Sequence, residues 1–295
     1  MTQRTYTSSE IREWKNCRLK WHFRHNELLV PKRPQEALSF GSLIHAGAEA
    51  YYRGNEWRLA IGQYIREQDT PWTSEESLFV IATACALLDG YIKRDPVIRL
   101  GHTVESVERE FIVQLRGPAG RKYSRHLLAG KRDLGTRDSS GNLWLWDHKT
   151  AANSLDPVKL DIDDQMSYYL WADKQDGISA CGIMYNLIRK PSIKPRKSEK
   201  PAEWGKRLAE DIESRPEFYY QQEQIVKSRR QMAQIQRDLW NLAHEIGVAP
   251  IYRNSHGTCS IFGCAYRDLC QNDSAAVRSA KFKIERPHSE LQEVV

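Results

Sequence analysis

The sequence lacks any apolar run long enough to cross a bilayer, and no apolar signal segment follows Met1. We therefore expect no membrane contact and a cytoplasmic location. The phosphate-binding pattern G-x-x-x-x-G-K-[S/T] is also missing, and so are internal repeats. These absences argue against a membrane-embedded protein and against an ATP-driven motor.

Cysteines are few, with six in 295 residues. In the reducing cytoplasm they are more often thiols or metal ligands than disulfides. Cys259, Cys264 and Cys270 are separated by four and five residues, close enough for neighbouring thiolates to bind one metal centre. Cys17 would supply a fourth ligand from the other end of the chain. The metal would then tie the two ends together.

Zinc is one candidate for this cysteine site, because the three C-terminal cysteines with Cys17 or His256 would complete a tetrahedron. However, the two-residue spacing typical of zinc ribbons is missing from these cysteines. The other two, Cys85 and Cys181, fall on apolar stripes of a predicted helix and a predicted strand. We interpret both as core residues.

The length allows one large domain or two small ones, and the cysteine site favours one. Hydrophobic residues make up 40% of the chain, and nine residues are tryptophan, which suffices for a core. The 44 basic and 38 acidic residues give a net charge of +6, and six basic residues lie between Arg189 and Lys200 beside one acid, Glu199. Two prolines there predict an exposed loop. It would contact phosphates or serve only as a solvated linker.

The first predicted helix begins at a capping box, in which Thr7 accepts from the backbone and Glu10 reaches back. Trp14, Cys17 and Trp21 recur at intervals of three and four residues and share one face of this helix. Cys17 is therefore expected to point inward.

The rest of the chain alternates between helical and extended patterns. A helix from Gly41 to Tyr52 carries His45, and another begins at a capping box formed by Thr73 and Glu76. Three strands, a helix, a strand and a long helix are then predicted, in that order: 104–115, 126–134, 142–148, Asp161 to Asp173, 178–188 and Glu217 to Ile246. Residues from Ser274 onward show no clear period.

A group of polar residues lies in these strands. In the third predicted strand, Leu143 and Leu145 share a face with Asp147 and Lys149, so the acid and the lysine emerge together where the apolar face ends. Thirteen residues separate Asp147 from Asp133, which closes a G-x-x-D pattern. Oxygen ligands suit Mg²⁺ or Mn²⁺, which neutralises the charge that builds on phosphate during phosphodiester cleavage.

The polar residues form a joint pattern. G-x-x-D is followed by D-x-K and then by Q-x-x-x-Y, at Gln165 and Tyr169, while His45 lies earlier in G-x-x-x-H. With the cysteine site, this pattern resembles the RecB-type nucleases of the PD-(D/E)XK superfamily. It is similar in particular to the iron–sulfur branch, which includes AddB-type nucleases, CRISPR-associated adaptation nucleases and phage exonucleases. The similarity extends from Cys17 to Cys270.

The resemblance implies an α/β fold with a restriction-endonuclease-like core of helix, three strands, helix and strand. Added helices and a cysteine-ligated cluster that joins the termini would complete the fold. A single iron–sulfur nuclease domain would then cover residues 1–273, and a C-terminal tail would cover residues 274–295.

The resemblance also implies roles for the polar residues. Asp133, Asp147 and His45 would bind Mg²⁺ or Mn²⁺ together with the backbone carbonyl of His148. Lys149 would orient or deprotonate the attacking water and stabilise the charged phosphorane. An imidazole in an otherwise oxygen-rich site favours manganese over magnesium.

Gln165 and Tyr169 lie one helical turn apart and project together. In RecB-type nucleases this pair borders the site and helps hold the lysine and the nucleic acid; otherwise the two residues only form a polar helix face. Glu108 and Glu110 in the first predicted strand could contribute another carboxylate, and the pattern does not settle which.

The implied activity is metal-dependent hydrolysis of DNA, as an exonuclease on single strands or duplex ends, in recombination, repair or replication. A [4Fe–4S] cluster on Cys17, Cys259, Cys264 and Cys270 would pin the C-terminal segment to the first helix. The alternative is a catalytically weak DNA-binding scaffold module of such an assembly, although all expected catalytic positions are filled. RNA is compatible with the same residues. A helicase or recombinase would be a separate partner.

Overall fold

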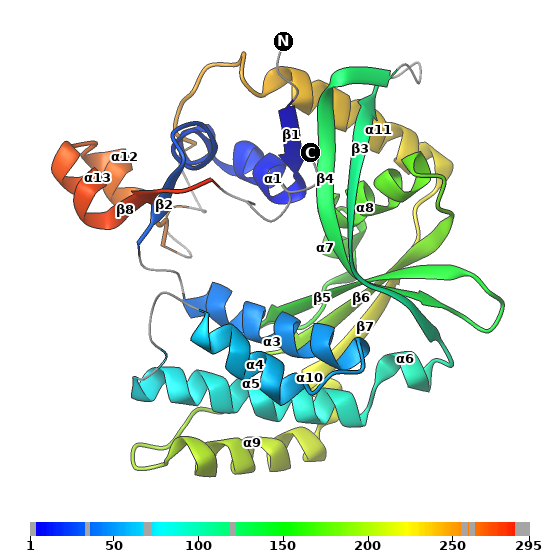
Figure 1. The fold of residues 1–295 in the computed structure, drawn as a ribbon, viewed down its shortest axis with the longest axis vertical. Coiled ribbons are helices and arrows are strands. Elements are labelled where there is room, and N and C mark those ends of the chain that lie inside the picture. The colour runs from blue at the N-terminus through cyan, green and yellow to red at the C-terminus, as the bar shows by residue number, and fades with distance from the viewer. Residues whose placement is uncertain are drawn as a thin grey trace.

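A computed structural model describes residues 4–32, 36–67, 72, 74–117, 122–254, 259 and 263–286. Its centre is a mixed sheet of six strands in the order β1-β4-β5-β6-β7, with β3 paired to β4 (Figure 1). The strands are β1 (Arg4–Thr7), β3 (Thr103–Arg116), β4 (Lys122–Arg137), β5 (Leu143–Ala151), β6 (Ala180–Arg189) and β7 (Tyr220–Ile225). The α/β class expected from the sequence is confirmed.

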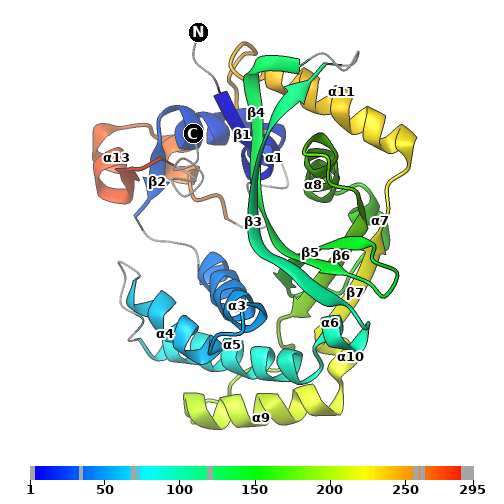
Figure 2. The same cartoon turned by 45° about the vertical axis from the view of Figure 1, so that its right-hand side comes forward.

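Helices cover both faces of the sheet (Figure 2). One face carries α1 (Ser8–Asn16), α8 (Asp164–Gln175) and α11 (Arg229–Glu245), whose apolar residues share a core with the strands. The other carries α3 (Glu36–Tyr52), α4 (Trp57–Arg66), α5 (Glu75–Lys93) and α9 (Pro201–Ser214), which form a second core with Ile188 of β6. Short helices lie in the connections: α6 (Pro96–Arg99), α7 (Pro157–Asp161) and α10 (Pro216–Tyr219).

The pairing of β4 changes partner along one edge. Residues 126–129 pair in parallel with β1, and residues 134–137 pair antiparallel with β5. Between these two stretches, β4 has no ladder partner on this edge among the described residues. Asp133 lies at this fork, so the fold itself creates an opening in the sheet beside an expected site residue.

A small lobe joins residues from both ends of the chain (Figure 1). Its N-terminal elements are α2 (Arg18–Trp21), the π-helix η1 (His22–Asn26) and β2 (Leu29–Pro31); its C-terminal ones are α12 (Arg267–Gln271), α13 (Ala275–Lys281) and β8 (Phe282–Ile284). β2 and β8 form an antiparallel pair, and the Tyr266 hydroxyl donates to the Leu29 carbonyl at 2.7 Å. The region expected as a tail therefore contributes a helix and a strand as far as Ile284.

The first helix begins at Thr7 as expected, but Glu10 does not close the predicted capping box, and the helix ends early. Thr7 caps α1 and accepts from the Glu10 N–H at 3.2 Å, whereas the Glu10 carboxylate accepts from the Trp21 indole at 3.1 Å and from Arg4. Cys17 has an extended backbone (φ −160°, ψ 111°) and separates α1 from α2. The prediction of one continuous helix through Cys17 is wrong, because an extended residue cannot continue the i to i−4 ladder.

Most predicted strands and helices are confirmed, but the long helix from Glu217 to Ile246 is wrong. Its first part forms α10 and β7, and only α11 is a long helix. Ser228 begins α11 with a capping box to Gln231. β7 reads Tyr-Gln-Gln-Glu-Gln-Ile, without alternation, and is a strand because it pairs with β6. Tertiary pairing thus overrides local pattern here.

The sequence also predicted a helix that begins near residue 73 and no membrane-spanning helix. The helix after residue 73 begins at α5, where Ser74 is the N-cap and accepts from the Ser77 N–H; Thr73 lies outside the described residues. None of the helices in the described part of the chain combines the length and apolar character that a membrane span requires.

Candidate active site

The candidate site begins where β4 and β5 separate. Leu134 and Trp146 form the last pair of their ladder, so Asp133 and Asp147 are the first residues beyond it. The His148 N–H is free of this ladder and donates to Oδ2 of Asp133 at 2.7 Å. The fork therefore brings two acids from different strands to one opening and connects them through the backbone.

Lys149 lies beside Asp147, as the strand alternation predicts. Its Nζ donates to Oδ1 of Asp147 at 2.8 Å, and the lysine is 30% exposed whereas the aspartate is 1% exposed. The other oxygen of Asp147, Oδ2, is buried and has no hydrogen-bond partner within the described residues. A buried carboxylate oxygen without a donor is destabilising by itself, and a cation would satisfy it.

His45 comes to the same place from α3. Its Nδ1 lies 3.6 Å from Oδ2 of Asp133. Burial acts to raise the pKa of Asp133, but His45 and Lys149 outweigh it and hold that pKa below its ordinary value. Gly41 of α3 faces β5, where a Cβ at that position would lie 3.4 Å from the Thr150 hydroxyl, an ordinary contact distance.

Glu108 belongs to this group, although the sequence left it undecided. Ligand atoms of His45, Glu108 and Asp133 all lie within 4.8 Å of one another. The Glu108 side chain is 7% exposed and pairs with Lys131, and burial followed by the charge of Asp133 raises its pKa. Its backbone is left-handed (φ 52°), which is strained for a residue with a Cβ and is often found at functional sites.

Glu110, the alternative to Glu108, is exposed on the same strand. No pattern of residue types marks a left-handed residue inside a strand, so the sequence alone offered no means of choosing between the two. The strand pairing supplies the missing information, because β3 and β4 align Val107 with Leu134 and Arg109 with Arg132, which sets Glu108 opposite Asp133.

The side chain of His148 is buried in a polar network formed by residues of α3, α5, β6 and β7. Its ring stacks parallel to Tyr52 at 5.9 Å, and its Nδ1 accepts from Asn186 Nδ2 at 2.9 Å. Asn186 also donates to the Tyr91 hydroxyl and accepts from Gln222. Burial lowers the pKa of His148 to about 4, so its imidazole is neutral near pH 7. These contacts hold the His148 side chain in this network. The backbone carbonyl of His148 is therefore the group that would bind the metal.

Gln165 and Tyr169, both on α8, form one wall of the candidate site. Gln165 Nε2 donates to the Tyr169 hydroxyl at 2.7 Å. Burial and then the charge of Asp147 raise the pKa of Tyr169 to about 12. Gly130 makes room for this wall, since a Cβ there would lie 2.7 Å from the Phe111 ring and 3.3 Å from Tyr169. This contact gives the glycine of G-x-x-D a packing reason.

The donor set fits a hard divalent cation. Glu108, Asp133 and His45 form one close group of candidate ligands, and Asp147, which is not in that group, is near enough to be influenced by the charges of Asp133 and His45. Carboxylate oxygens suit Mg²⁺ and Mn²⁺, and an added imidazole suits Mn²⁺ better. Among the described residues, the buried Oδ2 of Asp147 has no hydrogen-bond donor, so it is free to bind a divalent cation.

Metal affinity should depend on pH through Asp147. Burial raises its pKa to about 6, although Lys149 opposes this shift. The carboxylate must lose its proton to bind metal, so Mn²⁺ affinity should rise between about pH 5 and about pH 7 and then level off. Titration calorimetry with Mn²⁺ across this range measures the effect, and Asp147→Asn should reduce it. Wild-type affinity that is constant with pH would contradict this assignment.

Glu108→Gln should weaken Mn²⁺ binding about 10-fold, because the amide keeps the size of the side chain and removes its charge. Glu110→Gln, on the same strand but exposed, is the matched control and should bind Mn²⁺ like the wild type. Calorimetry at about pH 7.5 compares the two variants. Equal affinities would remove Glu108 from the site.

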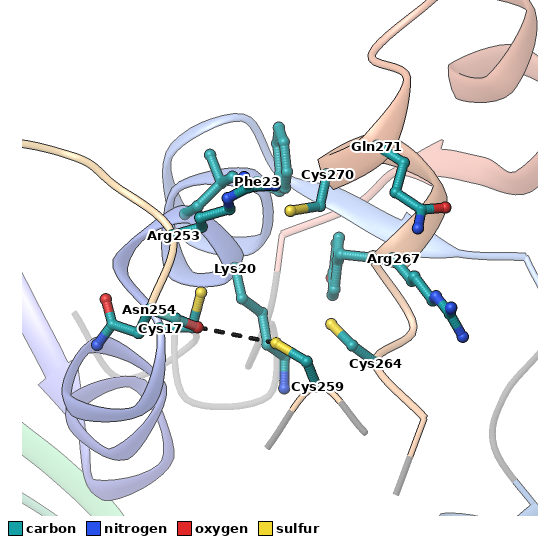
Figure 3. Close-up of a pocket in the computed structure, with 12 residues that line it drawn as sticks. Cys17, Lys20, Phe23, Arg253, Asn254, Cys259, Cys264, Arg267, Cys270 and Gln271 are labelled. Carbon is teal, nitrogen blue, oxygen red and sulfur yellow. Dashed lines mark hydrogen bonds between the residues drawn. The ribbon is translucent and has the colours of Figure 1, made fainter. Parts of the chain in front are cut away.

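The four cysteines of the expected cluster line one pocket of about 440 Å³ between the two ends of the chain (Figure 3). All four are free thiols, and no three of their sulfur atoms lie within 4.8 Å of one another among the described residues. Cys259 donates to the Asn254 carbonyl, and burial raises the pKa of Cys264. The pocket is lined by Cys17, Cys259, Cys264 and Cys270, with Lys20, Phe23 and Tyr266 among its other residues.

Cys85 and Cys181 were both predicted to be core residues, and only one of these predictions agrees with the structure. Cys85 is half-buried and packs against the core of α3, α5 and α9, which agrees with a packing role. Cys181 is exposed, so its interpretation as a core residue is wrong. It lies near the start of β6, where the burial pattern of the strand has not yet begun. His256, the alternative zinc ligand, lies outside the described residues.

Comparisons with known proteins agree with this geometry at the level of the family. Residues 5–271 match the PD-(D/E)XK nuclease superfamily. A comparison with curated protein sequences finds no match. Among solved structures, the protein SSO0001 is 13% identical over 81% of this chain and 86% of its own, with a TM-score of 0.32.

A second solved structure, from Eubacterium rectale, carries the provisional name exonuclease. It is 11% identical, covers 87% of this chain and 92% of its own, and has a TM-score of 0.43. At these TM-scores neither structural likeness bears on the assignment, which rests on the match over nearly the whole sequence. The chain belongs to the PD-(D/E)XK nuclease superfamily.

Proposed function

We propose that this protein is a divalent-metal-dependent deoxyribonuclease that hydrolyses phosphodiester bonds, as an exonuclease on single-stranded DNA or duplex ends. The observation that carries the proposal is the fork between β4 and β5. There the His148 N–H donates to Asp133, and Lys149 donates to one oxygen of Asp147, while the other oxygen has no partner among the described residues.

Each residue then has a part in the reaction. Asp133, Asp147, Glu108 and His45 would hold the ion, together with the backbone carbonyl of His148. A bound Mg²⁺ or Mn²⁺ neutralises charge on the phosphate and makes a coordinated water more acidic. The scissile phosphate would lie beside this ion, with His45 contributed by α3 and Gln165 and Tyr169 contributed by α8.

Lys149 acts as a cation in this mechanism. Burial acts to lower its pKa, but Asp147 and Asp133 outweigh this effect and raise the pKa above its ordinary value. A lysine that stays protonated cannot remove a proton from water. We therefore assign it the other role expected from the sequence: its ammonium orients the water and stabilises negative charge on the phosphorane.

The basic loop would extend the DNA-binding surface. β5 and β6 are parallel, and Ala151 pairs with Arg189, so residues 190–200 leave the sheet at the edge that carries Lys149. The loop has no regular structure, as predicted, and its only acid, Glu199, is engaged by Arg207. The exposed cations Lys194, Arg196 and Lys197 are then available to phosphates.

Replacing Lys194, Arg196 and Lys197 with alanine should weaken binding of single-stranded DNA and flatten its salt dependence. Each lost phosphate contact should reduce the slope of log affinity against log salt by about 0.7, because fewer counterions are released. Fluorescence anisotropy over a range of KCl concentrations measures the slope. A slope identical to that of the wild type would show that the loop is only a solvated linker.

The cysteines would hold a [4Fe–4S] cluster. Support comes from the shared pocket, which lies between α2 and η1 on one side and α12 on the other, and from its four cysteines. Such a cluster would add a metal-ligand bond network to the contacts of the small lobe. A reducing cytoplasm would keep the thiols available. Iron and zinc analysis of anaerobically purified protein distinguishes the two metals.

The proposed activity is tested by digestion of end-labelled DNA, single- and double-stranded, linear and circular, in Mn²⁺, in Mg²⁺ and in chelator. We expect cleavage of linear single strands or duplex ends in Mn²⁺, weaker cleavage in Mg²⁺ and none in chelator. Cleaved circles would make the protein an endonuclease, and a labelled RNA in parallel tests the sugar preference.

DNA that binds but stays intact in Mn²⁺ would favour the alternative function, a DNA-binding scaffold of a recombination, repair or replication assembly. Since the sequence lacks the phosphate-binding motif of an ATP motor, a separate helicase or recombinase would have to open duplex DNA. Adding a helicase and ATP should then extend digestion inward from duplex ends, and an unchanged extent would argue against such a partner.

A further inference from the structure

Arg12 of α1 reaches the wall of the candidate active site. Its Nη2 donates to Oε1 of Gln165 at 3.1 Å, and Nε2 of the same amide donates to the Tyr169 hydroxyl at 2.7 Å. Two hydrogen bonds thus connect an exposed arginine of the first helix to a residue whose pKa responds to the charges of Asp147 and Lys149. The function expected from sequence gave this arginine no part.

Among the described residues, Arg12 has no ion-pair partner. No carboxylate oxygen lies within 4.0 Å of it in the part of the chain that the structure describes. Its hydrogen-bond acceptor is a neutral amide, and a guanidinium has five N–H donors, so donors remain for another partner. A full positive charge is therefore held at the rim of an acidic site by an uncharged group.

The charge also acts within the site. Tyr185 pairs with Asp147 across the β5–β6 ladder. Burial raises the pKa of Tyr185 to about 12, and Asp147, Lys149 and Arg12 are among the charges that act on its hydroxyl. Arg12 therefore shares an electrostatic environment with the two residues at the centre of the proposed chemistry.

Lys15 provides an internal comparison. It lies on the next turn of α1, is also exposed, and also contacts the start of α8, but its partner is the carboxylate of Asp164. The two cations thus occupy equivalent places on one helix and contact adjacent residues of another. One is neutralised by an ion pair, and the other is not.

We propose that Arg12 is a substrate-binding residue that grips a backbone phosphate of the DNA strand next to the scissile bond, with Gln165 setting the direction of its guanidinium. The inference rests on the proposed nuclease function. A planar guanidinium matches two phosphate oxygens, and its bonds to an anion are about twice as strong as neutral ones. The phosphate accepts from the N–H groups of the Arg12 guanidinium that do not donate to the Gln165 amide.

The test compares Arg12→Gln, Arg12→Lys and the control Lys15→Gln, each in the Lys149→Ala background so that DNA stays intact. Affinity for a fluorescein-labelled single-stranded oligonucleotide is measured by anisotropy in Mn²⁺ over a range of KCl concentrations. Arg12→Gln should weaken binding about 10-fold and reduce the salt slope by about 0.7. Arg12→Lys should keep the slope, and Lys15→Gln should stay within about 2-fold of the parent.

Kinetics in the Lys149-containing protein separate binding from a structural role. Arg12→Gln should raise KM with a small change in kcat, because the phosphate is held in both the ground state and the transition state. A lower kcat with unchanged affinity and salt slope would mean that Arg12 only positions Gln165, and would overturn the proposal. So would equal behaviour of Arg12→Gln and Lys15→Gln.

The outcomes also separate this inference from the proposed function. If the wild-type protein neither binds nor cleaves DNA in Mn²⁺, the nuclease function itself fails. If it does both and Arg12→Gln behaves like the control, only the role of Arg12 fails. Thermal unfolding of all three variants confirms that each is folded, and Arg12→Lys preserves the test if the glutamine variant is not.

Discussion

Lys149→Ala is expected to slow DNA cleavage at least about 100-fold while DNA affinity changes less than about 2-fold. The lysine is hydrogen-bonded to Asp147. In the proposed mechanism it acts at the attacking water, so its loss would remove a stabilisation that exists mainly in the transition state. Its removal also leaves Asp147 without the cation that lowers its pKa. The comparison should therefore be made at about pH 8, where that carboxylate stays ionised.

Single-turnover cleavage of end-labelled DNA in saturating Mn²⁺ measures the rate, and anisotropy measures affinity. Lys159→Ala is the matched control, because Lys159 is 82% exposed and paired with Asp156 at the surface. It should cleave like the wild type. Wild-type turnover by Lys149→Ala would show that the active-site assignment is wrong.

Cys17→Ser should remove the proposed cluster and destabilise the small lobe. Anaerobically purified wild-type protein should be brown and contain about four iron atoms per chain, and the variant should be colourless. Cys17 contributes from the junction of α1 and α2, while the other three cysteines lie in the C-terminal segment. Loss of this ligand should therefore allow local separation of the two ends around the pocket, although β2 and β8 still pair.

Limited proteolysis reports that separation. The variant should be cut first between Ile251 and Gln271, and its thermal unfolding temperature should fall. Cys181→Ser, at an exposed thiol away from this pocket, should keep the iron and the proteolysis pattern. A colourless wild-type protein with stoichiometric zinc would replace iron with zinc and leave the nuclease proposal intact, because the carboxylate site is separate from the cysteines.

The parts of the fold that the sequence predicts are those with strong local signals. Alternation identified β3, β4 and β5, and Thr7 identified the start of α1. β7 was missed because its polar sequence has no alternation, and only pairing with β6 makes it a strand. Cys17 was placed inside a helix because periodicity continues across it, while the backbone is extended. Local pattern cannot reveal either effect.

Some contacts of the candidate site follow from local sequence pattern, and others depend on tertiary structure. D-x-K spacing on one strand places Asp147 beside Lys149, which follows from alternation alone. The approach of Asp133 depends on where β4 exchanges β5 for β1, and that of Glu108 depends on strand register and a left-handed backbone. Arg12 is joined to Gln165 across 153 residues of sequence. These contacts are tertiary, so residue types and spacing could not specify them.

Anomalous diffraction from crystals soaked in Mn²⁺ tests the central claim most directly, because it locates the ion without relying on activity. We expect a manganese peak at the fork between β4 and β5, with carboxylate oxygens of Asp133 and Asp147 at about 2.2 Å and the His45 ring within coordinating distance. An ordered manganese ion elsewhere, with no peak between these two aspartates, would contradict it.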